Sequence, residues 1–250
     1  NAGINNDNTI ARWIDLSGSG HIATQPTTNH QAKFSSSDNS ISFDGTNDFF
    51  SLNSNIISNT PYTIVVVEKR NADNANWLIG QPKNIVDNDL SRNKALYFGY
   101  SNTNEFVFDQ FQNGISGISV SNKKDQPDIV IGTSDKDATN QLNLYFNGDL
   151  KKSGNGNKGH LQGDEIYIGR TWNGYYTGDF HEVLIFNKVL SATERIKVNY
   201  YLSKKWNLQA SMDSDGDTIK DAVEVANSLN PIDPADGTQD ADGDGLTNAQ

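Results

Sequence analysis

The chain has 250 residues, and its 20 basic and 31 acidic side chains give a formal net charge of −11. It contains no cysteine and no apolar run as long as a membrane span, which excludes a disulfide framework, thiolate chemistry and insertion of a helix into a membrane. Residues 213–250 carry ten acids against one lysine while residues 1–212 are nearly neutral, and the lack of a basic surface excludes a nucleic-acid partner.

Short strands separated by Gly- and Asn-rich turns dominate the chain before the acidic segment. This spacing predicts a sandwich of antiparallel sheets. Asn147-Gly148 lies between two alternating runs and predicts a tight hairpin. The expected strands are, in chain order, "YTIVVVEKR" (62–70), "KALYFGY" (94–100), "NEFVFDQF" (104–111), the two arms of "QLNLYFNGDLKKS" (141–153), "DEIYIGR" (164–170) and "GDFHEVLIFNKVL" (178–190).

One helix is expected after the last strand, in "LSATERIKVNYYLSKKW". Ser191 and Glu194 have the spacing of a capping box, in which each side chain binds the backbone N–H group of the other residue. Lys204 and Lys205 fall in the last turn, where positive charge suits the helix dipole. We expect this helix to cover one edge of the sandwich and Trp206 to close it.

Five segments carry a resemblance to a known family: "WIDLSGSGHIATQ" (13–25), "ISFDGTNDFFSL" (41–52), "YTIVVVEKR", "LYFNGDL" and the run from "IYIGR" to "NGYYTGDFHEVLIFNKVLSATERIKVNYYLSKKW". Their order resembles the laminin-G-like, concanavalin A-like jelly roll of bacterial extracellular proteins. The resemblance implies an all-β fold over residues 1–208: a two-sheet antiparallel jelly-roll sandwich with one C-terminal helix. Members include lectins, carbohydrate-binding modules, adhesin domains and glycosidases, so the fold alone does not fix the function.

The sequence lacks catalytic patterns. Jelly-roll glycosidases carry an E-x-D-x-x-E run, which does not occur here. Glu182 has no acidic neighbour on its strand face to complete the pair of carboxyl groups that retaining hydrolysis needs, and we expect it to be structural. "GNGNKG" (154–159) precedes a strand rather than a helix, which argues against nucleotide binding. We therefore predict that the chain is not an enzyme.

Two groups of loop residues are candidate ligand-binding sites. The first comprises Trp172, Tyr175 and Tyr176 in "RTWNGYYTG" (170–178), whose rings either stack on a sugar or pack on the edge of the sandwich. The second comprises polar residues in and after the connection 80–93, because loops on a rigid sheet often frame ligand pockets. Its members are Gln81, Asp87, Asp89, Arg92, Asp109 and Gln112.

A further acidic group lies in "DGTND". Asp44, Asn47 and Asp48 offer oxygen ligands for a structural calcium ion, which relatives often hold near such loops. The same side chains can instead fix the turn by accepting hydrogen bonds from backbone N–H groups, and we favour this role for Asp44 and Asp48.

The acidic segment places oxygen-bearing residues at the spacing of calcium loops. In "DSDGDTIKDAVE" (213–224) the acids occupy positions 1, 3, 5, 9 and 12, with a backbone carbonyl at position 7, as in EF-hand loops. Position 6, a glycine in EF-hands, is Thr218 here and Gly245 in a second copy. The predicted metal ligands are Asp213, Asp215, Asp217, Ile219, Asp221, Glu224, Asp233, Asp236, Asp240, Asp242, Asp244 and Asn248.

The pattern D-x-D-G-D-x-[IL]-x-[DN], present twice, resembles thrombospondin type-3 repeats and implies such a region over residues 209–250. The resemblance implies calcium as the cofactor and a calcium-stiffened linker. Loops of this kind need millimolar calcium, so we expect an extracellular or cell-surface location. The chain begins without a signal peptide and ends inside the second loop, and we interpret it as part of a longer surface polypeptide.

These observations predict a non-enzymatic, lectin-like domain of a secreted or cell-surface bacterial adhesin that recognises an extracellular glycan. One alternative is a calcium-dependent domain that binds protein C-terminal peptides, because "LYFGYSNTNEFVFDQFQNG" resembles the peptide-binding jelly rolls of large bacterial adhesins. In that case a bound calcium ion or Arg92 would receive the terminal carboxylate. Two further alternatives are a structural spacer and an accessory module of a polysaccharide-degrading enzyme.

Overall fold

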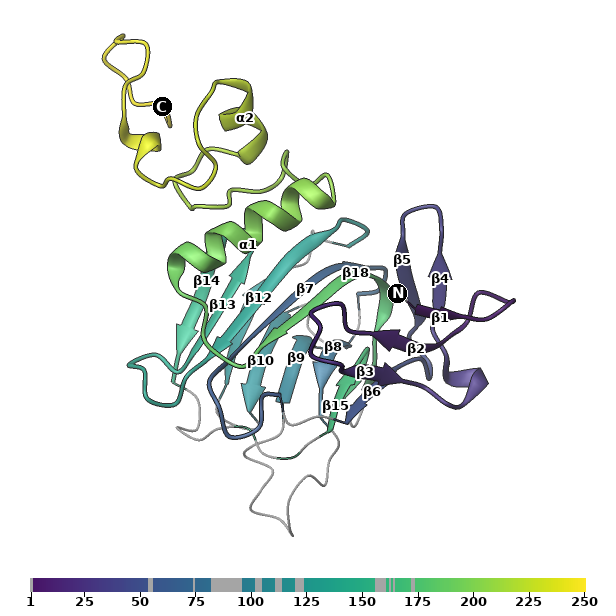
Figure 1. Cartoon of the computed structure of the whole chain (residues 1–250). Coiled ribbons are helices and arrows are strands. Elements are labelled where there is room, and N and C mark those ends of the chain that lie inside the picture. The colour runs from purple at the N-terminus through teal and green to yellow at the C-terminus, as the bar shows by residue number, and fades with distance from the viewer. Residues whose placement is uncertain are drawn as a thin grey trace.

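The architecture consists of two large antiparallel sheets packed face to face, with one long helix outside them and the acidic segment beyond that helix (Figure 1). This arrangement confirms the predicted two-sheet jelly-roll sandwich with a C-terminal helix. Among the described residues, no helix combines the length and the apolar composition that crossing a membrane requires. The computed structural model describes residues 2–53, 56–73, 75–81, 96–101, 105–110, 114–119, 124–155, 161, 163, 165–171 and 174–250.

The nine-stranded sheet, called sheet A below, has the strand order β1-β2-β3-β6-β15-β8-β9-β10-β11. The predicted hairpin of segments 94–100 and 104–111 is the pair β9–β10, in which Phe98 lies opposite Phe108. The strands of sheet A are β1 (Ala2–Ile4), β2 (Ile10–Ile14), β3 (Ile22–Thr24), β6 (Phe50–Asn53), β8 (Asn76–Gly80), β9 (Leu96–Tyr100), β10 (Glu105–Gln110), β11 (Ile115–Ser119) and β15 (Glu165–Ile168).

The seven-stranded sheet, called sheet B, has the order β14-β13-β12-β7-β18-β5-β4. Asn147 and Gly148 join β13 to β14 with φ angles of 53° and 94°, the positive values that a tight hairpin needs. The strands of sheet B are β4 (Lys33–Ser35), β5 (Ser40–Asp44), β7 (Tyr62–Arg70), β12 (Asp128–Ser134), β13 (Leu142–Phe146), β14 (Asp149–Gly154) and β18 (Thr177–Phe186). Outside both sheets lie the 3-10 helix η1 (Thr28–His30) and a short hairpin of β16 (Arg170–Thr171) and β17 (Gly174–Tyr175).

Strand β7 lies inside sheet B and is covered on both faces, which explains its unbroken run of β-branched residues. Ile64 and Val66 belong to the main core between the two sheets. Val65 and Val67 point the other way, into a second core beneath the helix. The predicted buried strand 62–70 is therefore confirmed.

Helix α1 (Ala192–Lys205) begins with the predicted capping box. The backbone N–H of Glu194 donates to the Ser191 hydroxyl at 3.3 Å, and the backbone N–H of Ser191 donates to the Glu194 carboxylate at 2.9 Å. The helix covers the outer face of sheet B rather than an edge of the sandwich, which corrects the expectation from the sequence (Figure 1). Leu202 is its fully buried contact in the second core.

Glu182 of β18 has the structural role expected for it. Its carboxylate accepts a hydrogen bond from Trp206 Nε1 at 2.8 Å and lies 2.8 Å from the ammonium group of Lys205. These two contacts fasten the end of α1 to sheet B.

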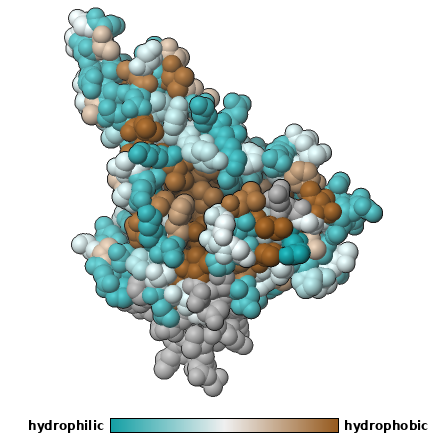
Figure 2. Space-filling view, viewed as in Figure 1, coloured by the Kyte–Doolittle hydropathy of each residue, from teal (hydrophilic) through white to brown (hydrophobic). Residues whose placement is uncertain are grey.

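The acidic segment continues from α1 through the short helices α2 (Asp221–Ala226) and η3 (Asp236–Thr238), which were not predicted. Leu208 and Met212, in the connection between α1 and the acidic segment, are buried in the second core. Figure 2 shows mostly hydrophilic side chains on the acidic segment, whereas apolar side chains gather below α1.

Candidate functional site

The outer face of sheet A carries a row of outward-pointing residues. Residues paired across neighbouring strands point to the same side of a sheet, and the register aligns Ser51, Tyr167 and Gly80. Ile166 and Ile168, which flank Tyr167 in β15, are buried in the main core. Tyr167 and Ser51 therefore point away from the core, and both are half-buried.

The β16–β17 hairpin packs over this face at Gly80. A Cβ atom on Gly80 would lie 2.5 Å from Cγ2 of Thr171 and 2.7 Å from the carbonyl oxygen of Arg170. A Cβ atom on Gly174 would likewise lie 2.8 Å from Cδ1 of Trp77. Only glycine at these two positions allows the hairpin to lie this close to β8. The hairpin therefore lies next to Tyr167 on the outer face of sheet A.

The guanidinium of Arg170 lies among three aromatic rings next to the hairpin. Its central carbon, Cζ, is 4.5 Å from the ring centroid of Phe49, 4.7 Å from that of Tyr167 and 4.7 Å from that of Tyr175. Cation–π attraction holds the guanidinium in this position. All four side chains, called the Arg170 cluster below, are half-buried, so each keeps part of its surface in solvent.

The charge of Arg170 has no carboxylate partner among the described residues. Its Nε donates a hydrogen bond to the backbone oxygen of Thr171 at 2.9 Å. Glu165, an acid on the same face, accepts a hydrogen bond from the Ser51 hydroxyl at 2.8 Å and makes no ion pair with Arg170. Burial raises the pKa of Tyr167, Glu165 adds to the rise, and Arg170 opposes it. The cluster therefore combines aromatic faces, a neutral phenol and a cation.

The structure separates the three residues of the predicted aromatic group. Tyr175 joins the Arg170 cluster. Tyr176 is fully buried, with its ring against Phe43 and Phe180 and its hydroxyl donating to Glu68. Its predicted contact with a ligand is therefore wrong, because neighbouring residues entering β18 point to opposite sides. Trp172 lies outside the described residues.

The second predicted group is only partly described. Gln81 is buried, and its side-chain oxygen accepts a hydrogen bond from the backbone N–H of Leu96 at 3.1 Å. Asp109 is half-buried in β10, opposite Tyr97. A pocket formed by this group stays a prediction. The members outside the described residues are Asp87, Asp89, Arg92 and Gln112.

Three members of the Arg170 cluster were not identified from the sequence. The alternation in "EIYIG" indicates that Tyr167 points away from two isoleucines, and this pattern identifies it as a surface ring. Arg170 lies inside the selected loop, but nothing local indicates that it stacks. Phe49 is distant in the sequence and is brought to Arg170 only by the pairing of β6 with β15.

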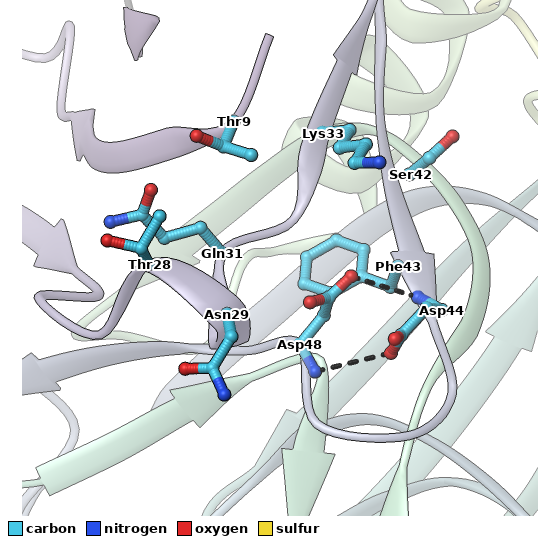
Figure 3. A pocket seen from close by; sticks show the side chains of 9 residues that line it. All are labelled: Thr9, Thr28, Asn29, Gln31, Lys33, Ser42, Phe43, Asp44 and Asp48. Carbon is cyan, nitrogen blue, oxygen red and sulfur yellow. Dashed lines mark hydrogen bonds between the residues drawn. The ribbon is translucent and has the colours of Figure 1, made fainter. Parts of the chain in front are cut away.

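A polar cavity of about 390 Å³ lies beside β4 and β5 (Figure 3). Asp44 accepts hydrogen bonds from the backbone N–H groups of Thr46 and Asn47 at 2.8 and 3.1 Å, and Asp48 accepts one from that of Asp44 at 3.1 Å. These bonds confirm the turn role of both acids. Burial, followed by the nearby Asp44 carboxylate, raises the pKa of Asp48 to about 6. The lining residues are Thr9, Thr28, Asn29, Gln31, Lys33, Ser42, Phe43, Asp44 and Asp48.

Three carboxylates of the first acidic loop and one from the later helix η3 lie close together. Asp215, Asp217, Glu224 and Asp236 each offer one oxygen, and these atoms all lie within 4.8 Å of one another. Glu224 is fully buried, and neither of its carboxylate oxygens has a hydrogen-bond partner among the described residues. Burial raises the pKa of Glu224 to about 8, and the neighbouring carboxylates, led by Asp215, add to the rise. An all-oxygen donor set of this kind suits a hard divalent cation.

Other predicted ligands in and near the first loop make hydrogen bonds within the acidic segment, and their binding of a metal stays a prediction. Asp213 accepts hydrogen bonds from the backbone N–H groups of Gly216 at 2.7 Å and Thr218 at 2.9 Å. The backbone N–H of Ile219 donates to Asp217 at 2.8 Å, and the predicted ligand role of the Ile219 backbone carbonyl stays a prediction. Asp233 is exposed and accepts a hydrogen bond from the backbone N–H two residues later at 3.2 Å.

Asp221 connects the acidic segment to the body of the protein. It is fully buried, and its carboxylate accepts hydrogen bonds from the Ser203 hydroxyl of α1 at 2.5 Å and from the backbone N–H and hydroxyl of Ser214, both at 2.8 Å. Both carboxylate oxygens are engaged, so the predicted metal-ligand role is replaced by anchoring. Beside this anchor, Gly148 of the β13–β14 turn lies against the carbonyl oxygen of Asp213, so closely that a side chain at position 148 would clash with it.

The second acidic loop repeats the hydrogen bonds of the first. Asp240 accepts bonds from the backbone N–H groups of Gly243 at 2.8 Å and Gly245 at 2.9 Å, as the first acid of the other loop does. Asn248, a predicted ligand, donates to the backbone oxygen of Asp236 at 2.7 Å and so ties the loops together. The acids of this loop that meet within 4.8 Å, all exposed, are Asp240, Asp242 and Asp244.

Thr218 is strained by its place in the first loop. It has a φ angle of 84°, close to the 93° of Gly245 at the same position of the second loop, and a β-branched residue rarely adopts such values. Replacing Thr218 with glycine should raise the midpoint of thermal unfolding, because relief of the strain stabilises the loop by about 1 kcal/mol. Gly245→Thr, the reverse change, should lower it. An unchanged or lower midpoint in Thr218→Gly would contradict the assignment of strain.

Comparison with solved structures supports the fold. The CBM40 of Ruminococcus gnavus IT-sialidase is 16% identical over 64% of this chain and 96% of its own length, with a TM-score of 0.51. The same CBM40 bound to α2,3-sialyllactose also gives a TM-score of 0.51, at 16% identity over 64% of this chain and 95% of that chain. Trypanosoma rangeli sialidase is 16% identical over 82% of this chain and 32% of its own, with a TM-score of 0.55. These identities establish similarity of fold alone.

No curated protein sequence matches the chain significantly. A family model described as the concanavalin A-like lectin/glucanases superfamily matches residues 44–194, from the last residue of β5 to the first turn of α1. This match covers more than half of the chain and includes all four residues of the Arg170 cluster. The protein therefore belongs to the concanavalin A-like lectin/glucanase superfamily.

Proposed function

We propose that this chain is a non-enzymatic, lectin-like domain of a secreted or cell-surface bacterial adhesin, and that it binds a glycan on the outer face of sheet A. The observation that carries the proposal is the Arg170 cluster. Its three rings offer apolar faces to the C–H groups of a sugar, and its guanidinium and phenol groups offer hydrogen bonds to sugar hydroxyls. The rings lie on a rigid sheet beside a packed hairpin, where a ligand site needs little reorganisation.

The acidic residues of the jelly-roll strands also support a binding role rather than a catalytic one. The sequence has no E-x-D-x-x-E run, and two strand glutamates are unsuited to hydrolysis. Glu68 is fully buried, and Glu182 is bonded to the end of α1. Among the related folds, the CBM40 of Ruminococcus gnavus has been solved with sialyllactose, which makes a glycan the first ligand class to test here.

The first test is an array that carries both glycans and peptides with free C-terminal carboxylates, probed in millimolar calcium and again in EDTA. Glycan binding supports the lectin-like function. Binding of C-terminal peptides that is lost in EDTA would replace it with the peptide-capture alternative. A blank array in both buffers would favour a structural spacer.

Replacing Tyr175 with alanine should lower the affinity for a bound glycan roughly tenfold, because a stacked ring with its buried area contributes about 1.5 kcal/mol. Tyr201→Ala is the matched control, since Tyr201 is 56% exposed on α1, which covers the other sheet. Isothermal titration calorimetry measures both variants. Equal affinities of Tyr175→Ala and the unaltered chain would place the glycan site elsewhere.

We also propose that calcium binds the acidic segment and stiffens it. Asp215, Asp217, Glu224 and Asp236 would hold one ion, and the support for this is the convergence of their oxygens around the buried, unpartnered Glu224 carboxylate. The exposed acids of the second loop would contribute to another. Loops of this kind act in millimolar calcium, which supports an extracellular location.

A further inference from the structure

We propose that the glycan bound at the Arg170 cluster is acidic, and that the Arg170 guanidinium pairs with its carboxylate or sulfate group. This inference rests on the proposed glycan site and specifies the chemical class of its ligand. The two anions share one chemistry, since both present oxygens that accept two parallel N–H bonds from a guanidinium.

The position of the guanidinium is fixed before any ligand binds. A guanidinium has five N–H donors, and in Arg170 the Nε–H group is used by the backbone oxygen of Thr171. Among the described residues, the Nη groups have no hydrogen-bond or ion-pair partner. The three rings around Cζ restrict rotation of the side chain, so little conformational entropy is lost when an anion pairs with it.

A ring-stacked arginine inside the sandwich shows what a purely structural role looks like in this protein. Arg70 is fully buried over the ring of Tyr100, with Cζ 4.4 Å from the centroid. Its Nη1 atom lies 3.6 Å from a carboxylate oxygen of Asp73 and donates a hydrogen bond to the backbone oxygen of Ala72. Its charge is thus balanced within the protein, whereas the charge of Arg170 is half-buried beside three rings and pairs with no acid in the described part of the chain.

The rings and the guanidinium together select an acidic sugar rather than an isolated anion. Phe49, Tyr167 and Tyr175 carry no formal charge and provide the apolar contacts that inorganic ions do not use. The partly desolvated guanidinium then strengthens binding of a sugar that places its anionic group at Arg170, because charge-assisted hydrogen bonds are stronger than neutral ones. A neutral sugar keeps the ring contacts but leaves this cation unpaired.

The experiment compares three probes by isothermal titration calorimetry: lactose, 3′-sialyllactose and 3′-sulfolactose. The unaltered protein should bind at least one acidic probe about tenfold more tightly than lactose. In Arg170→Gln the ratio of acidic to neutral affinity should fall to about one, whatever loss both probes share from altered ring packing. Arg170→Lys keeps the charge without the planar fork and should retain part of the ratio. Thermal unfolding confirms that each variant is folded.

The control is Arg12→Gln, which removes one exposed charge from β2 on the same side of the sheet, opposite Thr24. It should leave the ratio unchanged, and an equal fall in Arg12→Gln would overturn the pairing by showing general attraction to a positive surface. Equal affinities of the unaltered protein for all three probes would overturn the acidic ligand and leave glycan binding standing. Failure of all three probes to bind would overturn both. A preference for one acidic probe identifies carboxylate or sulfate as the paired group.

Discussion

Replacing Glu224 with glutamine should stabilise the protein in EDTA and destabilise it in millimolar calcium, relative to the unaltered chain. Without a cation, Glu224 is fully buried beside Asp215, Asp217 and Asp236, and its carboxylate has no hydrogen-bond partner among the described residues. Burial and the neighbouring carboxylates raise the pKa of Glu224 from 4.5 to about 8, so between these pH values the folded state takes up a proton that the unfolded chain has released. Glutamine mimics the protonated acid and removes this cost. With calcium bound, the same carboxylate becomes a ligand, and the variant loses that attraction.

The size of the calcium effect follows from mass action. A cation present at 100 times its dissociation constant stabilises the folded state by about 2.7 kcal/mol, and we expect most of this gain to disappear in Glu224→Gln. Asp233→Asn removes the same charge from the same segment, but Asp233 is exposed and lies outside the group, so it should keep the full calcium shift. Urea unfolding in both buffers measures the change. A calcium shift of equal size in Glu224→Gln would exclude this group as the cation site.

Replacing Glu68 with glutamine should remove a fall in stability that the unaltered protein shows as pH rises. Glu68 is fully buried between the sheets, where it accepts hydrogen bonds from the hydroxyls of Tyr100 and Tyr176. Burial raises its pKa from 4.5 to about 7, and Asp128 adds to the rise, while the two tyrosine bonds and Arg70 oppose it. The folded state therefore binds a proton that the unfolded chain has already released between these two pH values.

The direction in which stability changes with pH follows from this difference in bound protons. The contribution of Glu68 is fully present below about pH 4.5, where both states are protonated, and is lost as pH rises through about 7. Glutamine mimics the protonated acid, so the variant should match the unaltered protein near pH 4.5 and exceed its stability at pH 8 by up to about 3 kcal/mol. Urea unfolding from pH 4.5 to 8 in millimolar calcium measures the difference, with Glu105→Gln in β10 as control. Parallel pH profiles for Glu68→Gln and the unaltered protein would contradict the prediction.

The predictable parts of the fold depend on neighbours in the sequence. The β-branched run of β7, the Asn147-Gly148 turn and the Ser191–Glu194 capping box are each specified within a few residues, and the structure contains all three. The outer-face position of α1 was not predictable in this way, because it depends on which face of sheet B the second core leaves uncovered.

In the candidate sites too, some roles follow from the neighbouring sequence and others depend on residues that are distant in the chain. Two adjacent tyrosines in one loop look alike in the sequence, yet Tyr175 stacks beside Arg170 and Tyr176 enters the core, since strand β18 begins at the next residue. In the acidic segment, Asp221 and Asp236 were both predicted as metal ligands, but only Asp236 lies in the carboxylate cluster. Asp221 has the spacing of a ligand but meets serines of α1 and its own loop, whereas Asp236 reaches the other carboxylates only because the chain folds back after α2.

The anchor at Asp221 determines how mechanical force would pass through the molecule. A pull on the C-terminal end would reach the body at the Asp221–Ser203 contact and enter α1, and from there sheet B through the Glu182–Trp206 bond. Sheet A lies in the other layer of the sandwich, outside this route (Figure 1). The Arg170 cluster faces away from the layer to which the segment is tethered.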